Sequence, residues 1–302
     1  MDSQLFQPCE ICGGTSWSQS YSGTIRDGTF GSYRDAAVVA ECSGCGVQRL
    51  NEDCCLPDEF YETGEYRAKL KQDFDTESYF SGHDHLQIFA LQTLPLPKLR
   101  GSTVADIGCA GGSFLDHVQG IVGKIIAVEP FQEYHQSLKN RGYDVFSYAE
   151  KASRSVNSSV DFACSFQVIE HTANPRQFLA DIAPLLGPEG TLYISTPNRD
   201  DILMSLLPDD YPSFFYRVVH RWYFNAKSLA ECARLAGYDV SEVHHVHRYS
   251  LSNALRWLRD RKPTGNAPMT GIDKSADKHW KSQLENSESS DCLFMALKPS
   301  SL

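Results

Sequence analysis

A glycine-rich stretch near the middle of the 302-residue chain constrains the fold more than any other feature. A short apolar run ends at Asp106, small residues follow over 108–112, and residues 113–118 have the pattern of a helix start. A strand that leads through such a turn into a helix suits an adenosine cofactor, because glycine lets the backbone approach the ligand closely. Glu129 ends the next apolar run, where an acidic side chain can bind the ribose hydroxyls.

Apolar runs alternate with helical or loop segments through the rest of the chain. This alternation is typical of a parallel sheet whose two faces are covered by helices. Ligands of such sheets bind beyond the carboxyl ends of the strands, so the residues that follow each strand are candidate site residues. The predicted strands are residues 103–107, 125–128, 144–147, 160–166 and 190–195, with two later ones at 238–246 and 291–297.

At the glycine-rich stretch the sequence resembles the class I S-adenosylmethionine-dependent methyltransferases. Their first motif runs Asp-x-Gly-x-Gly-x-Gly; Asp106, Gly108 and Gly112 match it, and Ala110 replaces the middle glycine. The Gly-x-Gly-x-x-Gly spacing of dinucleotide sites does not occur here, so a methyl donor is the better interpretation. The resemblance covers about residues 100–300 and implies a Rossmann-like, mostly parallel sheet with an antiparallel last strand.

The resemblance also implies which residues bind S-adenosylmethionine. Family members contact the adenine with residues after the third strand, and the methionine part with residues after the fourth. The fourth motif of the family ends Val-x-Glu-His, matched here by Val168, Glu170 and His171, and for that Glu-His pair we favour a packing and capping role over catalysis. The predicted cofactor-binding residues are Asp106, Gly108, Cys109, Ala110, Gly112, Phe114, Glu129, Pro130, Ala149, Glu150, Phe166, Gln167 and His171.

Two Cys-x-x-Cys pairs lie near the N-terminus, and glycine follows each of them. They are Cys9 with Cys12 and Cys42 with Cys45. Two such pairs predict a tetrahedral Zn²⁺ site in a small ribbon of short strands, with a structural role because four thiolates leave no open position on the metal. The alternatives are a redox Cys-x-x-Cys and buried thiols without a metal. Cys54 and Cys55 are interpreted as bystanders.

A histidine after the fifth predicted strand is the candidate catalytic base. His220, Tyr223 and Phe224 match the end of a Tyr-His-Glu-His-x-x-Tyr-Phe stretch that carries the base in nucleotide-sugar C-methyltransferases, whereas residues 217–219 depart from it. The departure disfavours methylation of carbon. A hydroxyl acceptor must lose one proton, which suits a histidine. We predict His220 and Tyr223 as catalytic residues; the alternative is that His220 only hydrogen-bonds across its loop.

The predicted organisation has three parts. Residues 1–55 form a zinc-ribbon-like module, residues 56–100 a helical connection that is either a substrate lid or plain core, and residues 101–302 the methyltransferase domain with an insertion at 248–290. No run of 18 apolar residues and no secretory leader is evident, so we expect no membrane span and a cytoplasmic protein. The net charge of −10 disfavours nucleic acid as a partner.

The expected acceptor is a small molecule with a hydroxyl group. The His-x-x-Tyr-Phe stretch and the Ala-Gly-Tyr end of the next helix resemble bacterial sugar methyltransferases, which implies a sugar or nucleotide-sugar of surface polysaccharide or secondary metabolism. Three alternatives stay open: an rRNA or tRNA methyltransferase with an N-terminal zinc site, a quinone or natural-product O-methyltransferase, and a silent methyltransferase fold that acts as a binding subunit.

Overall fold

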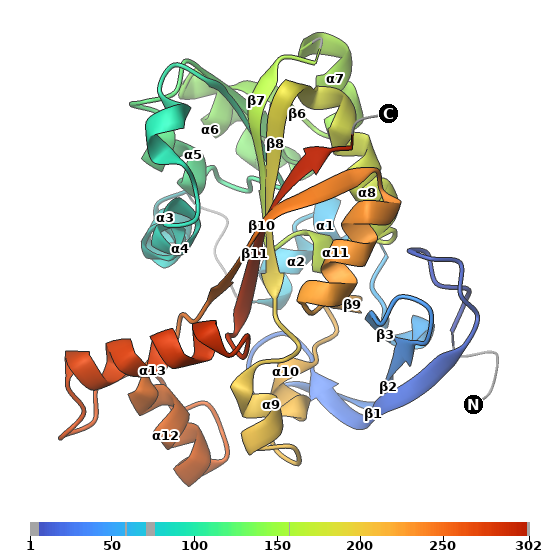
Figure 1. The fold of residues 1–302 in the computed structure, drawn as a ribbon, viewed down its shortest axis with the longest axis vertical. Helices are drawn as coiled ribbons and strands as arrows, with labels where there is room; N and C mark the ends of the chain where they lie inside the picture. The colour runs from blue at the N-terminus through green and yellow to red at the C-terminus, as the bar shows by residue number, and fades with distance from the viewer. Residues whose placement is uncertain (1–5, 58, 71–75, 157, 301–302) are drawn as a thin grey trace. The chain divides into compact units, whose positions relative to one another are not determined.

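The computed structural model describes residues 6–57, 59–70, 76–156 and 158–300 (Figure 1). The chain divides into two compact units, each built from separate stretches. The first, which we call the ribbon unit, comprises residues 1–56, 196–229 and 243–294. The second, the sheet unit, comprises residues 57–195, 230–242 and 295–302. Residues 58 and 71–75 of the predicted helical connection lie outside the described residues.

A seven-stranded sheet has the order β10-β11-β8-β7-β4-β5-β6. The pairs from β8 to β6 are parallel. Ser300 N donates to Gly237 O at 2.9 Å and Ser241 Oγ to Ala296 O at 3.0 Å, so the start of β10 lies beside the end of β11 in an antiparallel pair. The predicted Rossmann-like methyltransferase fold is therefore confirmed. Its strands are β4 Thr103–Ile107, β5 Lys124–Val128, β6 Asp144–Phe146, β7 Val160–Phe166, β8 Leu186–Pro197, β10 Tyr238–Val246 and β11 Cys292–Pro299.

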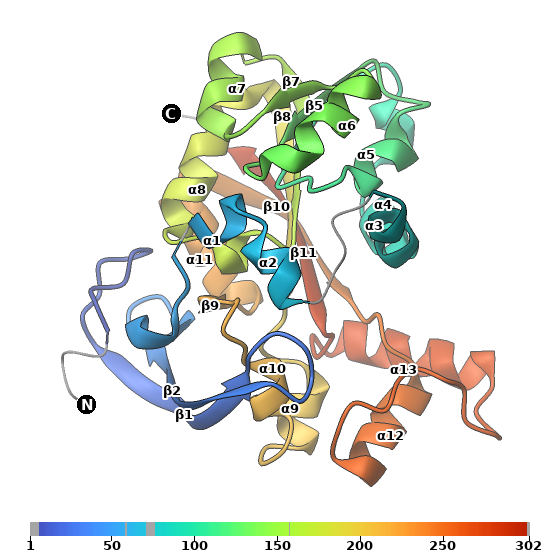
Figure 2. The ribbon, with the colours of Figure 1, turned by 180° about the vertical axis from the view of Figure 1, so that it is seen from behind.

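Helices cover both faces of the parallel strands. Helices α5 (Ser113–Val118) and α6 (His135–Asn140) lie on one face, and α7 (Ala149–Val156) and α8 (Pro175–Ile182) lie on the other (Figures 1 and 2). Helix α8 begins where the sequence favours it, because the Asn174 side chain accepts a hydrogen bond from Gln177 N and a proline occupies the first turn. Strands covered on both faces must be apolar throughout, which is why their positions were predicted closely.

Short helices precede β4 in the sheet unit. They are α1 Glu59–Glu62, α2 Glu65–Lys69, α3 Thr76–His83 and α4 Gln87–Leu91. The 3₁₀ turns of the described chain are η1 Glu52–Cys54, η2 Asp84–Leu86, η3 Leu96–Leu99, η4 Gln132–Tyr134, η5 Ile169–His171 and η6 Ala183–Leu185.

The ribbon unit contains a second, four-stranded antiparallel sheet of order β1-β2-β3-β9. Its strands are β1 Trp17–Arg26, β2 Tyr33–Cys42, β3 Gln48–Leu50 and β9 Trp222–Tyr223. The ribbon of strands between the cysteine pairs is as predicted, whereas the pairing of β9 with β3 was not. A distant segment therefore completes the N-terminal sheet.

The remaining helices are α9 Ile202–Leu206, α10 Pro212–Phe215, α11 Ala226–Leu235, α12 Leu251–Asp260 and α13 Lys274–Asn286. Side chains from β1, β2, α9, α10 and α12 share one core in the ribbon unit, which includes Ile25, Val39, Phe215 and Trp257. No helix among the described residues is both long and apolar enough to cross a membrane.

Candidate functional site

The glycine-rich loop joins β4 to α5 at the carboxyl end of the sheet. Gly108 N and Cys109 N both donate to Val128 O, at 2.8 and 3.2 Å, which ties the loop to β5. Gly108 has φ +79°, and a Cβ there would lie 2.5 Å from Val168 Cγ2. Gly112 has φ +86°, and its Cβ would lie 2.7 Å from Leu138 Cδ2. Only glycine satisfies both the left-handed backbone and the close approach at these two positions.

Ala110 adopts the left-handed conformation that the family's middle glycine allows. Its φ is +46°, which costs about 1–2 kcal/mol for a residue with a Cβ. Ala110 N donates to Glu129 Oε2 at 2.7 Å, so the turn is held by the acidic residue at the tip of β5. Cys109 and Phe114 flank this turn with buried side chains.

Glu129 is positioned as a binder of hydroxyl groups. Its other oxygen, Oε1, accepts from Phe131 N at 2.9 Å, and the side chain is 7% exposed. A carboxylate has about four acceptor positions, so two remain for ribose hydroxyls after the two backbone bonds. Pro130 follows and is half-buried. The residues fit an adenosine cofactor at this edge of the sheet.

Asp106 lies at the end of β4 beneath the loop and is buried. Burial, and then the nearby charge of Glu129, raise its pKa to about 8. Burial also raises the pKa of Glu129, against the hydrogen bonds from Phe131 and Ala110 that lower it. The two adjacent carboxyl groups therefore do not both ionise readily near neutral pH.

This pair predicts a pH dependence of stability. A carboxyl group with a raised pKa binds its proton more tightly in the folded chain, so its contribution to stability is complete below about pH 4 and is lost as the pH rises towards about 8. We expect the free energy of unfolding, measured with urea, to fall between pH 5 and pH 8. In Asp106→Asn the fall should be smaller, by on the order of 2 kcal/mol. Asp260→Asn, at a half-buried carboxylate that pairs with Arg259, is the control; a fall that is equal in all three proteins would contradict the assignment.

Phe166 and Gln167 lie at the end of β7, which neighbours β4. The rings of Phe166 and Phe114 meet edge to face with 5.1 Å between centroids. Gln167 has φ +58°, and two bonds hold it in this uncommon conformation: Gln167 N donates to Ser195 O at 2.9 Å and Nε2 donates to Ser195 Oγ at 3.2 Å. Backbone strain of this kind is concentrated at functional sites. The strained backbone of Gln167 agrees with the contact to the cofactor that the sequence predicts, and that contact stays a prediction.

His171 contacts two tyrosines of the short helices. Its ring lies 5.3 Å from that of Tyr61 and 5.6 Å from that of Tyr66, between centroids, with the rings nearly edge to face. Ala149 is buried at the start of α7, whereas Glu150 is exposed and pairs with Arg154. Glu150 therefore directs its carboxylate along α7.

The predicted site residues did not include Tyr79, which covers the loop. A Cβ at Gly111 would lie 2.5 Å from the Tyr79 ring, which stacks on His83 at 4.3 Å. The Arg67 guanidinium lies 5.2 Å from the centre of the same ring. Ser113 Oγ at the start of α5 donates to Asp84 Oδ1 at 2.7 Å. This bond ties the residue after α3, the helix that carries Tyr79, to α5. The tyrosine-rich composition of this segment was the only signal in the sequence, and it fits a plain core equally well.

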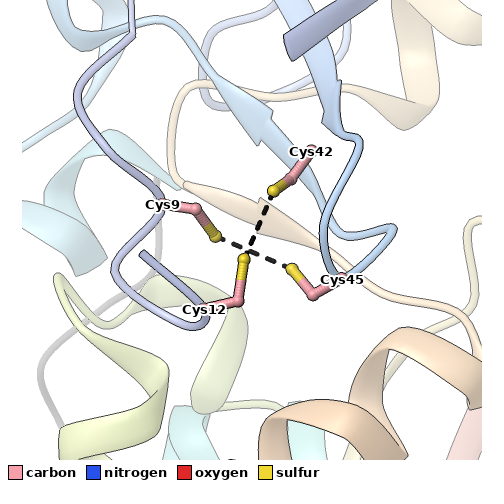
Figure 3. Close-up of side chains that lie close together, drawn as sticks. All are labelled: Cys9, Cys12, Cys42 and Cys45. Carbon is pink, nitrogen blue, oxygen red and sulfur yellow. Dashed lines mark hydrogen bonds between the residues drawn. The ribbon is translucent and has the colours of Figure 1, made fainter. Parts of the chain in front are cut away.

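The four cysteines of the two Cys-x-x-Cys pairs converge in the ribbon unit (Figure 3). Cys9 Sγ and Cys45 Sγ are 3.7 Å apart, and Cys12 Sγ and Cys42 Sγ are 3.5 Å apart. All four sulfurs lie within 4.8 Å of one another. Tetrahedral Zn²⁺ with bonds of about 2.3 Å requires sulfurs about 3.8 Å apart, so the donor set fits this ion.

The two turns that carry the cysteines have the same backbone. Gly13 N donates to Cys9 O at 2.7 Å and Gly46 N to Cys42 O at 2.8 Å. Both glycines have φ near +73°, with values of +74° and +73°. Each turn directs two sulfurs to one point, as the spacing predicted.

The pKa values of two thiols in the four-cysteine cluster differ widely. A hydrogen bond from Cys45 lowers the pKa of Cys9 to about 6, whereas burial raises the pKa of Cys42 to about 11. Four thiolates at this spacing repel one another, and a divalent cation is what removes the repulsion. Arg49, fully buried and 2.8 Å from Glu10 Oε1, adds positive charge beside the first pair.

The two predicted catalytic residues belong to the ribbon unit. His220 is 6% exposed, and its ring lies 6.1 Å from that of Tyr223. The Tyr223 hydroxyl accepts from Arg217 N at 2.9 Å and donates to Arg217 O at 3.0 Å. Because this hydroxyl both accepts from and donates to the backbone of Arg217, Tyr223 stabilises the loop that carries His220.

Comparison with known proteins agrees with this architecture. Residues 84–243 match the family described as methyltransferase domain. The ubiquinone biosynthesis O-methyltransferase of Parvibaculum lavamentivorans is 27% identical over 121 residues, covering 38% of this chain and 47% of that protein. The enzyme of the same name from Aeromonas salmonicida is 28% identical over 175 residues, covering 52% of this chain and 71% of that protein. The chain thus spans about half of the first relative and more of the second.

A solved structure shares the fold. A chain of the complex between the Haloferax volcanii Trm112 methyltransferase activator and a methyltransferase aligns with a TM-score of 0.51 and 17% identity, covering 82% of this chain and all of that one. The family match takes in more than half of the 302 residues and includes β4 to β8 with the glycine-rich loop. This chain therefore belongs to the methyltransferase-domain family, which confirms the predicted class I S-adenosylmethionine-dependent methyltransferase domain.

Proposed function

We propose that this protein transfers the methyl group of S-adenosylmethionine to a hydroxyl oxygen of a small acceptor. The observation that carries the proposal is the loop over 108–112, closed onto β5 and hydrogen-bonded to Glu129. Glu129 would bind the ribose hydroxyls, and Phe166, Gln167 and His171 would hold the methionine part. The cofactor supplies an already activated methyl group, so the chain's task is to orient the acceptor and to take up its proton.

His220 is the proton acceptor in this proposal. His220 is buried, and the neutral form of an imidazole can accept the hydroxyl proton as the oxygen attacks. Tyr223 is a positioning residue, because its hydroxyl fixes the backbone of Arg217 at the start of the same loop.

Two classes of hydroxyl acceptor fit the proposal. The relatives named as ubiquinone biosynthesis O-methyltransferases favour a quinone precursor as the acceptor. A sugar or nucleotide-sugar rests on the His-x-x-Tyr-Phe resemblance, and no comparison supports it. Both require the same removal of a hydroxyl proton.

The ribbon unit supplies the second part of the proposal. Its four cysteines would bind one structural Zn²⁺, since their spacing fits tetrahedral coordination. The unit also contains His220 and the whole 248–290 insertion. We propose that it recognises the acceptor.

The test is release of S-adenosylhomocysteine with phenolic quinone precursors, nucleotide-sugars and bulk RNA. We expect turnover on one class of small hydroxyl compound, and a loss of about 10²–10⁴-fold in His220→Gln with unchanged affinity for S-adenosylmethionine. His279→Gln, an exposed histidine of α13, is the matched control and should retain full activity. Equal turnover in all three proteins would remove His220 from the mechanism. Turnover on RNA alone would replace the proposed acceptor class, and donor binding without any turnover would favour a silent binding subunit.

A further inference from the structure

Two arginines of the ribbon unit lie side by side although they are far apart in the sequence. Arg26 ends β1, and Arg217 follows α10; the two residues form an isolated parallel bridge. Arg26 N donates to Tyr216 O at 3.1 Å, and Val218 N donates to Arg26 O at 3.0 Å. Bridged residues of neighbouring strands are about 5 Å apart and direct their side chains to the same face. The backbone therefore brings two guanidinium groups together.

Neither guanidinium group forms a salt bridge within the described part of the chain. The Nε atoms of both are buried and make no hydrogen bond with any described residue. The Arg26 guanidinium lies 4.1 Å from the centre of the Phe214 ring, so an aromatic face holds it in place. Burial, followed by the charge of Arg217, lowers the pKa of Arg26 to about 10.

Two buried carboxylates of the same unit, Asp291 and Asp201, are engaged elsewhere. Asp291 accepts from Arg248 Nε at 2.6 Å, and Asp201 accepts from the Tyr211 hydroxyl at 2.8 Å. The leading electrostatic influences on Arg26 come from Arg217 and three tyrosines, Tyr211, Tyr249 and Tyr223. Tyr249 is 39% exposed as a whole residue, and burial raises the pKa of its hydroxyl.

Placing two guanidinium groups together without a counter-charge destabilises the fold. Like charges placed opposite each other on a sheet destabilise it, and a buried polar group without a partner costs about 1–3 kcal/mol. The cost disappears when an anion binds between the two groups. Arginine forks match the oxygens of a phosphoryl group and bind them through two parallel hydrogen bonds, whereas a single carboxylate satisfies only one fork.

We propose that Arg26 and Arg217 bind a phosphoryl group of the methyl acceptor. The assignment of the ligand as the acceptor rests on the proposed methyl transfer; the anion site itself does not. The acceptor would then be a phosphorylated compound with a free hydroxyl, anchored by its phosphoryl oxygens while another part of the molecule is methylated.

The test is calorimetric titration of the full, zinc-loaded chain with inorganic pyrophosphate at constant ionic strength. We expect the wild type to bind and Arg26→Gln and Arg217→Gln each to bind at least about tenfold more weakly, since each loses a charged fork. Arg259→Gln, an exposed arginine of α12 paired with Asp260, is the matched control and should bind as the wild type does. Pyrophosphate binding that is absent from the wild type, or equal in all four proteins, would overturn the site.

Two further measurements separate the possibilities. Arg217→Lys keeps the charge but loses the fork; it should fold and still bind pyrophosphate more weakly, and wild-type affinity in this variant would contradict the proposal. Titrations with uridine diphosphate and with a hexose phosphate identify the source of the phosphoryl group, and specific binding of either supports the site. If the chain binds pyrophosphate but not S-adenosylmethionine, the proposed methyl transfer is contradicted and the anion site is not. A chain that transfers methyl groups but binds no pyrophosphate would contradict the anion site alone.

Discussion

Replacing Cys12 by serine is expected to abolish stoichiometric zinc binding and to unfold the ribbon sheet. Cys12 Sγ lies 3.5 Å from Cys42 Sγ, and a Cβ on Gly44 would lie 3.0 Å from it, so the sulfur is closely surrounded. Structural zinc sites contribute about 10–16 kcal/mol in zinc-finger peptides, and losing one thiolate forfeits much of this. Metal analysis should show one Zn²⁺ per wild-type chain and little in the variant. The unfolding temperature should fall by on the order of 10 °C.

Cys55→Ser is the matched control for this prediction. Cys55 lies in the same unit and is half-buried, but its Sγ contacts the carbonyl groups of Leu50 and Asn51 instead of the four-cysteine cluster. Its zinc content should equal that of the wild type. If Cys12→Ser also retains one Zn²⁺ and the wild-type unfolding temperature, the cluster is not a zinc site.

Replacing Gly108 by alanine is expected to weaken binding of S-adenosylmethionine at least about 100-fold. The new Cβ would lie 2.5 Å from Val168 Cγ2 and would impose a left-handed conformation on a residue that disfavours it. The loop can relieve the steric overlap and the backbone strain only by moving away from β5. This movement breaks the hydrogen bonds from Gly108 N and Cys109 N to Val128 O. Calorimetric titration with S-adenosylmethionine measures the effect.

Gly120→Ala is the control for the glycine prediction. No heavy atom lies within 4 Å of a Cβ at Gly120. This variant should bind the cofactor with wild-type affinity. Equal affinities in Gly108→Ala and the wild type would show that the cofactor does not approach this loop.

The buried parallel strands were predictable because burial on both faces demands continuous apolar runs. β4 and β7 begin and end where the sequence pattern placed them. Helix α13 was missed because only Leu284 of its 13 residues is buried, so no apolar stripe marks it. Its capping residue, Asp273, accepts from Ala276 N and was the available local signal.

The site was predictable where its chemistry depends on short spacings. The Cys-x-x-Cys turns and the Asp106-to-Gly112 motif each occupy one local stretch, and Glu129 follows at the next strand tip. The contact of Tyr79 with Gly111 depends on tertiary packing, which no spacing reveals. The same holds for Arg26 and Arg217, since only the folded backbone brings two such distant segments of the sequence into one bridge.

The most direct test of a methyl-donor site at the tips of β4 and β5 is calorimetric titration of the wild type and Glu129→Gln with S-adenosylhomocysteine. The substitution places an amide NH₂ where one carboxylate oxygen accepts from Ala110 N or Phe131 N, so it should disturb the loop as well as the ribose contact. We expect one binding site per wild-type chain and an affinity at least about tenfold lower in the variant. Identical affinities, or no binding to the wild type, would contradict the assignment.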